Sequence, residues 1–330
     1  MDTPSTGNHT PSAALDRTSA ATSSGRGLAI AGLPVRLVVN EPALVVEVDR
    51  LFAPMPDHDG PYAAEIIFQA DAPAVPAREP DEVYGPIQLW RDGVELFLDS
   101  GGPLHARATP SSVVVGGVVG DGALGAMLLR RIVHHVIAHV LSLSGRLVAH
   151  GAAVGRHGKG VLMLGASGSG KSSSAYLASL AGWSLLSDDL VVVAQGAHGL
   201  ELVGVHRAIA VPPEVIEAEA SDIEHDLRDR RRPDVVLDAR PHRLAAVALV
   251  GHGREHGSVE SVSGLEIAHA FIGSTPAAGN TDVAAEALRT AATLATYPRY
   301  RLLLPDTAKE RLRETAGLFE SLAASAGIEK

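Results

Sequence analysis

Apolar residues follow two different periods along the chain, and the change of period divides it into regions. In residues 27–119 they form short runs bounded by turn residues, which predicts strands at 37–39, 44–48, 64–68, 87–90, 94–98 and 112–115. Arg91-Asp92-Gly93 supplies a hairpin turn, and the four prolines in Asp71 to Pro86 predict a loop. We therefore expect a β-rich N-terminal domain over residues 27–121.

A helical period follows this region. Apolar residues recur at helical spacing from Gly122 to Ser144, and Gly145 ends the predicted helix. Further along, strands are expected at 161–164, 183–186, 190–194 and 300–304, and helices at 172–181, 282–296 and 307–326. We expect residues 122–330 to form an α/β domain, with the C-terminal elements completing its core.

Composition limits the classes of function. The 330-residue chain has a net charge of −10 and one arginine-rich cluster, Arg228–Pro233, so nucleic-acid binding is not expected. It has no cysteine, which excludes disulfides and thiolate chemistry and suits a reducing cytoplasm. Residues 1–26 lack the apolar core of a secretion signal and are predicted to be a disordered leader. No apolar run is long enough for a bilayer, so no membrane association is expected.

The clearest motif follows the apolar strand 161–164. It is a complete phosphate-binding loop, and its glycines permit positive φ and inward-facing backbone N–H groups. Lys171 is expected to reach the β and γ phosphate oxygens of ATP, and Ser172 to place its hydroxyl on Mg²⁺. The residues expected to bind the nucleotide are Gly165, Ala166, Ser167, Gly168, Ser169, Gly170, Lys171, Ser172 and Ser173. A glycine- and serine-rich turn that matches by chance is the alternative.

Two acidic residues return to this loop after a short interval. Gly182 is expected to end the helix, and the next strand ends at Asp188-Asp189. This interval indicates acid/base or metal chemistry beside the γ-phosphate, with a helix cap or a solvated loop as the alternative. Upstream, His150 and a glycine-rich turn at residues 155–160 lead into the strand of the loop.

Together, the His-Gly pair, the glycine-rich turn, the phosphate-binding loop and the Asp-Asp pair resemble the catalytic domain of the HPr kinase/phosphorylase family. The match covers roughly forty to fifty residues and leaves out the N-terminal third. The resemblance implies a P-loop kinase core of the HPr kinase and phosphoenolpyruvate-carboxykinase type. It also implies ATP- and Mg²⁺-dependent phosphorylation of a serine hydroxyl on a protein or peptide. In that picture Asp189 is the base, Asp188 supports it or binds metal, and His150 lies near the γ-phosphate.

The sequence departs from the family at two places. The position of a metal-binding glutamate holds Val205, with Glu201 and Glu214 as the substitutes considered. The segment Arg240–Leu244 is similar to the family's Arg-Pro-Gly-Arg-Asn loop but has His242 for glycine and Leu244 for asparagine. Kinase activity is therefore better supported than the reverse phosphorylase reaction. Arg240 and Arg243 are still expected to contact phosphate or substrate, and one arginine of Arg228–Pro233 could steady the transferring group.

Several alternatives stay open. The chain could be a catalytically idle nucleotide sensor or scaffold, or a kinase for a small metabolite. The acceptor could be a small phosphocarrier protein or a precursor peptide. The N-terminal domain could recognise substrate, form a homo-oligomer contact or cap the core. His135 and His139 have the i, i+4 spacing of a zinc site, but no acidic residue lies between them, so a packed helix is the preferred interpretation.

Overall fold

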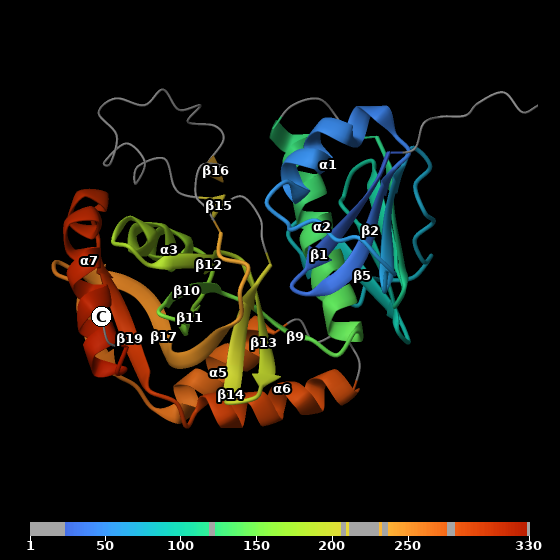
Figure 1. Cartoon of the computed structure of the whole chain (residues 1–330). Helices are drawn as coiled ribbons and strands as arrows, with labels where there is room; N and C mark the ends of the chain where they lie inside the picture. Colours follow the sequence, from blue (N-terminus) through green and yellow to red (C-terminus); the bar gives the residue numbers. More distant parts are fainter. Residues whose placement is uncertain are drawn as a thin grey trace, which may run out of the picture.

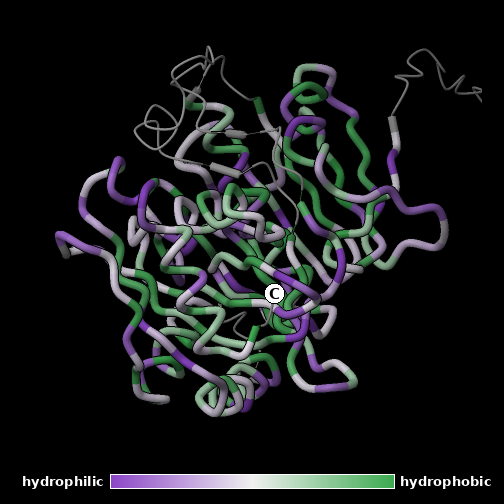
Figure 2. The backbone as a smooth tube through the Cα atoms, turned by 60° about the vertical axis from the view of Figure 1, so that its left-hand side comes forward, coloured by the Kyte–Doolittle hydropathy of each residue, from purple (hydrophilic) through white to green (hydrophobic). Residues whose placement is uncertain are grey.

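The chain folds as a mixed α/β protein built on two mixed sheets, each covered by helices (Figure 1). The computed structural model describes residues 24–118, 123–205, 209–210, 231–232, 237–275 and 281–328. Hydrophobic residues lie mainly inside both sheet regions, and hydrophilic residues lie mainly at the turns (Figure 2). The arrangement therefore follows the hydropathy of the sequence.

The first sheet has eight strands in the order β1-β2-β3-β8-β7-β6-β5-β4. Neighbours β2, β3 and β8 are parallel, and every other pair is antiparallel. The bounds are β1 Ser24–Ile30, β2 Leu33–Val39, β3 Ala64–Gln69, β4 Glu82–Tyr84, β5 Ile87–Asp92, β6 Glu95–Asp99, β7 Leu104–Ala108 and β8 Ser112–Gly117.

Two expectations for this region were wrong. The segment expected as strand 44–48 is helical, with a 3₁₀ turn η1 (Pro42–Leu44) followed by α1 (Val45–Phe52). Glu41 caps the first turn and Pro42 favours helical φ there, while Val48, Leu51 and Phe52 are buried at helical spacing. Tertiary burial thus overrides the strand preference of valine. The predicted loop at residues 71–86 also contains a short strand, β4.

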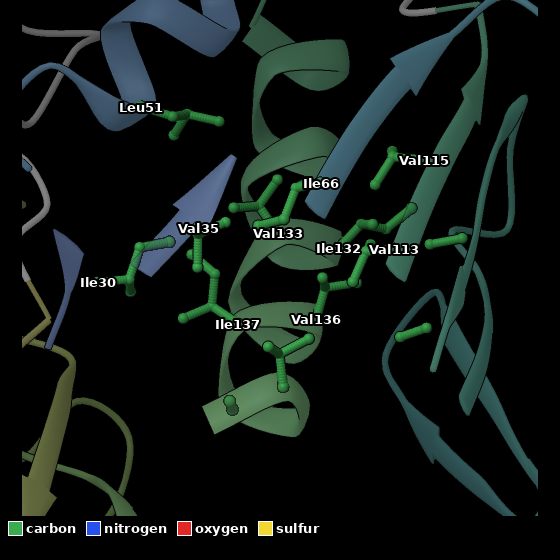
Figure 3. Close-up of a cluster of buried hydrophobic side chains, with 14 of the residues drawn as sticks. Ile30, Val35, Leu51, Ile66, Val113, Val115, Ile132, Val133, Val136 and Ile137 are labelled. Carbon is green, nitrogen blue, oxygen red and sulfur yellow. The ribbon is translucent and has the colours of Figure 1, made fainter. Parts of the chain in front are cut away.

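Helix α2 (Ala123–Leu143) packs against the first sheet. Figure 3 shows Ile132 directed toward Val113 and Ile137 directed toward Val35. A helix that we assigned by sequence to residues 122–330 therefore shares its core with the N-terminal strands. The same core includes Val148, Leu190 and Val192 of the second sheet, so apolar contacts join the two regions.

The apolar character of α2 has a structural cause. Among the described residues, Leu124–Leu143 is long and apolar enough to cross a membrane by length and composition, and 56% of that window is buried inside the protein. A helix that faces a core on several sides is apolar around most of its circumference. Burial against the sheet therefore explains why α2 has so many apolar side chains.

The second sheet has nine strands, with the path β12-β10-β11-β17-β14-β13-β9 and with β19 and β18 added beside β17. Strand β17 is parallel to β11 and β19, and the other pairs are antiparallel. The bounds are β9 Leu147–His150, β10 Ala152–Arg156, β11 Lys159–Leu164, β12 Ser184–Ser187, β13 Leu190–Gly196, β14 Gly199–Gly204, β17 His242–Arg254, β18 Ser258–Ser261 and β19 Arg299–Pro305. Strands β15 (Ile209–Ala210) and β16 (Arg231–Arg232) pair separately.

Helices cover both faces of this sheet. Helices α3 (Lys171–Leu180) and α7 (Ala308–Ser325) lie on one face, and α5 (Gly264–Ser274) and α6 (Thr281–Leu294) lie on the other (Figure 1). Strand β11 serves both layers, because Met163 joins the α3 and α7 core and Leu162 joins the α5 and α6 core. The predicted helices at 172–181, 282–296 and 307–326 are confirmed within two residues at each end.

Candidate active site

The loop between β11 and α3 is tight because of its glycines. Gly165, Gly168 and Gly170 have φ of 149°, 79° and 95°. A Cβ on Gly165 would come within 2.7 Å of the Val250 carbonyl oxygen, and one on Gly170 within 2.6 Å of Leu304 Cδ1. Positive φ and close packing thus both favour glycine, as the sequence predicted.

Lys171 begins α3 and folds back over this loop. Its ammonium donates hydrogen bonds to the carbonyl oxygens of Gly165 at 2.8 Å and Ala166 at 2.9 Å. The residue is only 6% exposed. Burial lowers the pKa of the ammonium, and the nearby charge of Asp189 opposes that shift. The lysine is therefore a buried cation positioned at the mouth of the loop.

The Asp188-Asp189 pair lies next to the start of α3. It occupies the connection from β12 to β13, while His150 ends β9 and Gly151 connects β9 to β10. These two connections touch, because His150 is the register partner of Leu190 and the Gly151 N–H donates to the Asp189 carbonyl at 3.0 Å.

The start of α3 is joined to the acidic pair by a hydrogen bond. The Ser172 hydroxyl donates to the Asp188 carbonyl oxygen at 3.2 Å, and Asp188 itself is 7% exposed. The loop, the lysine and the acidic pair therefore share one edge of the second sheet.

The Asp189 carboxylate lies between two imidazoles. His134 Nδ1 hydrogen-bonds Asp189 Oδ2 at 3.1 Å, and His150 Nδ1 lies 3.1 Å from Asp189 Oδ1. The His150 nitrogen is at ion-pair distance but makes no hydrogen bond with the described residues.

His134 was not predicted as a site residue, although its helix was. The sequence drew attention to His135 and His139, and the structure does not bring those two together. His135 lies against Tyr84 with ring centroids 5.5 Å apart, and His139 Nε2 contacts the Val94 carbonyl at 3.0 Å. Burial lowers the pKa of each imidazole to about 4. His139 is buried and His135 is half-buried, which agrees with the preferred interpretation of a packed helix with partly exposed histidines.

The structure does not bring Arg240 and Arg243 to the loop. Arg243 is the register partner of Lys159 at the start of β11, whereas the loop follows the end of that strand. Five residues of strand, about 16 Å, separate the two places. Arg240 instead pairs with Asp238, with its guanidinium 2.7 Å from the carboxylate and its side chain 79% exposed. Arg240 precedes β17 and Arg243 is its second residue, so both lie at the opposite edge from the loop. This corrects the expected contact with a phosphate bound in the loop, and the expected contact with substrate stays a prediction.

Glu201 and Glu214 were the candidates for a second acidic metal ligand. Glu201 is the register partner of Arg243, so it also lies at the distant edge, and Glu214 is outside the described residues. Val205 lies beside the acidic pair, because its N–H donates to the Leu190 carbonyl at 3.1 Å and its carbonyl accepts from Ser187. Within the described part of the chain, this family glutamate position therefore offers a buried aliphatic side chain.

Two arginine expectations fall outside the described residues. Arg207, which can be aligned with the arginine that ends the family's glutamate motif, belongs to residues 206–208, and of the cluster Arg228–Pro233 only the backbone of β16 is described. Their relation to the site stays a prediction.

His252 was missed by the sequence reasoning. It lies near the end of β17, and a Cβ on Gly170 would come within 2.9 Å of its Nε2. The backbone of Gly168 hydrogen-bonds the imidazole, while burial is the main cause that lowers its pKa. Because β17 is parallel to β11, its carboxyl end meets the same sheet edge, and that rule could have identified the residue.

No family model matches the sequence, and no curated protein matches it. Among solved structures, the chain is similar to the HPr(Ser) kinase/phosphatase from Coxiella burnetii. The likeness covers 54% of this chain and 97% of that chain, at 14% sequence identity and a TM-score of 0.28. The fold relationship is weak at these values, so the case for a function depends on the site itself.

Proposed function

We propose that this chain is an ATP- and Mg²⁺-dependent phosphotransferase of the serine-kinase type that acts on a protein or peptide hydroxyl. One observation carries the proposal: a buried lysine in a glycine loop shares a sheet edge with an acidic pair, joined by the Ser172 hydroxyl and the Asp188 carbonyl at 3.2 Å. Phosphoryl transfer depends mainly on positioning and charge stabilisation, and this edge offers groups of both kinds.

The loop fits the phosphates of a nucleotide. Gly170 is the N-cap of α3, and no side chain caps this helix. The backbone N–H groups of its first turn therefore remain available to a phosphate in the loop. The Ser169 hydroxyl is buried and makes no hydrogen bond with the described residues. Lys171 donates to two backbone carbonyls that phosphate oxygens can replace. A Cβ at Gly165 or Gly170 would clash with neighbouring atoms at 2.6–2.7 Å, so glycine is required for this tight turn of the loop.

Mg²⁺ would be held by the Ser172 hydroxyl and the Asp188 carboxylate, which are oxygen donors of the kind this ion prefers. ATP supplies the phosphoryl group and Mg²⁺ offsets the negative charge of the phosphates. Lys171 provides a cation beside those phosphates. Asp189 orients the acceptor hydroxyl and takes its proton, and a late proton transfer requires little driving force. The hydrogen bond from His134 holds the Asp189 carboxylate in place, and His150 Nδ1 lies 3.1 Å from its other oxygen.

Replacement of Asp189 tests the assignment of the base. Asp189→Asn is nearly isosteric and cannot accept the proton, so phosphoryl transfer should fall about 100-fold or more. Nucleotide binding, measured separately with a fluorescent ATP analogue, should stay within about three-fold, because the loop is untouched. Asp238→Asn is the matched control, since this aspartate lies with Arg240 at the distant edge.

The results separate the candidate functions. Full transfer by Asp189→Asn would remove this residue as the base. ATP binding by the unaltered chain without transfer to any acceptor would favour a nucleotide sensor instead.

The acceptor can be identified directly. Incubation with a γ-thiophosphate analogue of ATP and a cell lysate should tag a protein or peptide on serine. Tags confined to small metabolites would overturn the protein-kinase proposal and favour a metabolite kinase.

A further inference from the structure

Three metal-ligating side chains from three different elements converge beside the acidic pair. His134 comes from α2, His150 from the end of β9 and Asp189 from the β12–β13 connection. One ligand atom from each lies within 4.8 Å of the other two. The imidazole-to-carboxylate contacts are 3.1 Å on both sides.

These spacings suit a small ion. Zinc binds imidazole nitrogen and carboxylate oxygen at about 2.0–2.2 Å, which places tetrahedral ligand atoms roughly 3.3 Å apart. The two 3.1 Å contacts are close to that value but involve different oxygens of Asp189, Oδ2 toward His134 and Oδ1 toward His150. One ligand atom from each residue already lies within 4.8 Å of the others, so a small rotation of the carboxylate and the imidazoles completes the spacing. Two nitrogens and one oxygen favour a transition ion of the zinc class over Mg²⁺, which prefers oxygen donors throughout.

The ligands are held firmly but remain reachable. The His134, His150 and Asp189 side chains are 19%, 42% and 22% exposed. The pairing of β9 with β13 fixes the last two, and the packing of α2 in the first core fixes the first. Lys171 is the nearby charge that opposes a cation, and its ammonium is directed to the carbonyls of the loop.

We propose that His134, His150 and Asp189 form a binding site for a divalent transition-metal ion of the zinc class, with a fourth position open to solvent. The site links the helix of the N-terminal region to the edge of the second sheet. A further consequence rests on the proposed function: a carboxylate that ligates the ion cannot also accept a proton, so occupancy inhibits phosphoryl transfer.

Cobalt is a suitable probe because its visible absorption reports coordination. Metal-stripped full-length protein is titrated with Co²⁺, and one equivalent should give d–d bands that Zn²⁺ removes and Mg²⁺ leaves in place. His134→Ala should weaken Co²⁺ binding by at least about 10-fold, since loss of even an outer-sphere partner costs that much. His150→Ala provides a second variant in a half-exposed position.

The matched control is His256→Ala, because this imidazole is 70% exposed and lies 3.3 Å from Glu314 of α7, away from the three ligands. It should bind Co²⁺ like the unaltered protein. Absence of the bands, or bands that persist equally in His134→Ala and His150→Ala, would overturn the site. ATP binding and Mg²⁺-dependent transfer are measured on the metal-stripped protein and again after one equivalent of Co²⁺. Normal transfer without cobalt binding overturns the metal site alone. Transfer by the stripped protein that falls when Co²⁺ binds supports both proposals, whereas cobalt binding with no transfer by the stripped protein supports the site and overturns the kinase.

Discussion

The parallel strands β11 and β17 begin at one edge of the second sheet, here called the starting end, and finish at the opposite edge, the finishing end. The two ends carry different groups of charged residues. At the starting end, Asp238 contacts the Arg240 guanidinium at 2.7 Å and His242 Nε2 at 3.1 Å, so its charge is matched within the chain. At the finishing end, Lys171 donates to backbone carbonyls of its own loop. The first arrangement stabilises the fold. In the second, the Lys171 ammonium is hydrogen-bonded to uncharged carbonyl groups, which a phosphate can replace.

The pKa shifts follow the same division. Hydrogen bonding to Arg240 is the main cause that lowers the pKa of the Asp238 carboxyl, so the folded protein favours its charged form. Burial lowers the pKa of Lys171, so the folded protein disfavours the charged form there. A titratable group whose charged form is disfavoured by burial is typical of a functional site. A group whose charged form is stabilised by its partners is typical of a structural one.

The largest effect is expected from the lysine of the finishing end. Lys171→Ala removes the buried ammonium from the loop, so phosphoryl transfer should fall by about 100-fold or more, as when one preorganised donor is lost. ATP affinity, measured by calorimetry, should fall with it.

Lys159→Ala is the control from the other end of the same strand. The Lys159 ammonium donates to the Gly327 carbonyl at 2.6 Å, far from the loop, and its loss should leave transfer within about two-fold. Equal losses in both variants would mean that the two ends do not differ in the way the geometry indicates.

A smaller effect, on stability, is expected at the starting end. Asp238→Asn should lower the free energy of unfolding by about 1–3 kcal/mol at pH 7, because hydrogen bonds to a charged carboxylate are lost from a mostly buried position. Urea unfolding measures this difference. Transfer should be unchanged at a temperature where both proteins are folded.

The sign of the pH dependence follows from the lowered pKa of Asp238. Its folded pKa lies below the ordinary value of 3.8, so its stabilisation is present above that pH and is lost as pH falls toward the folded value. The difference in unfolding free energy between the two proteins should therefore shrink below pH 3.8. A difference that grows on acidification would contradict the assignment.

Local patterns predicted much of the finishing end. The glycines of the loop, the short helix α3 and the strand that ends before Asp188 all depend on neighbouring residues in sequence. The meeting of His150 and Asp189 followed from the resemblance and agrees with the β9–β13 register.

Contacts between distant segments were harder to predict. His134 meets Asp189 across 55 residues, and that contact requires the packing of α2 onto the first sheet. Periodicity identified the helix but did not tell which of its histidines faces the acidic pair. The helix α1 was missed for a similar reason, because the burial of Phe52 and its neighbours decides against the local strand preference.

The smallest effect is expected from Arg243, where the sequence expectation and the geometry disagree most directly. Its backbone pairs with Lys159, about 16 Å of strand away from the loop, so Arg243→Ala should leave transfer within about two-fold. Steady-state rates at saturating ATP measure this, with Lys171→Ala as the inactive reference. A ten-fold loss with unchanged unfolding free energy would mean that the distant edge takes part in the reaction. Because one chain holds the two ends apart along paired strands, Arg243 would then contact either the acceptor or the loop of a second copy, and only the second case makes the transfer rate depend on protein concentration.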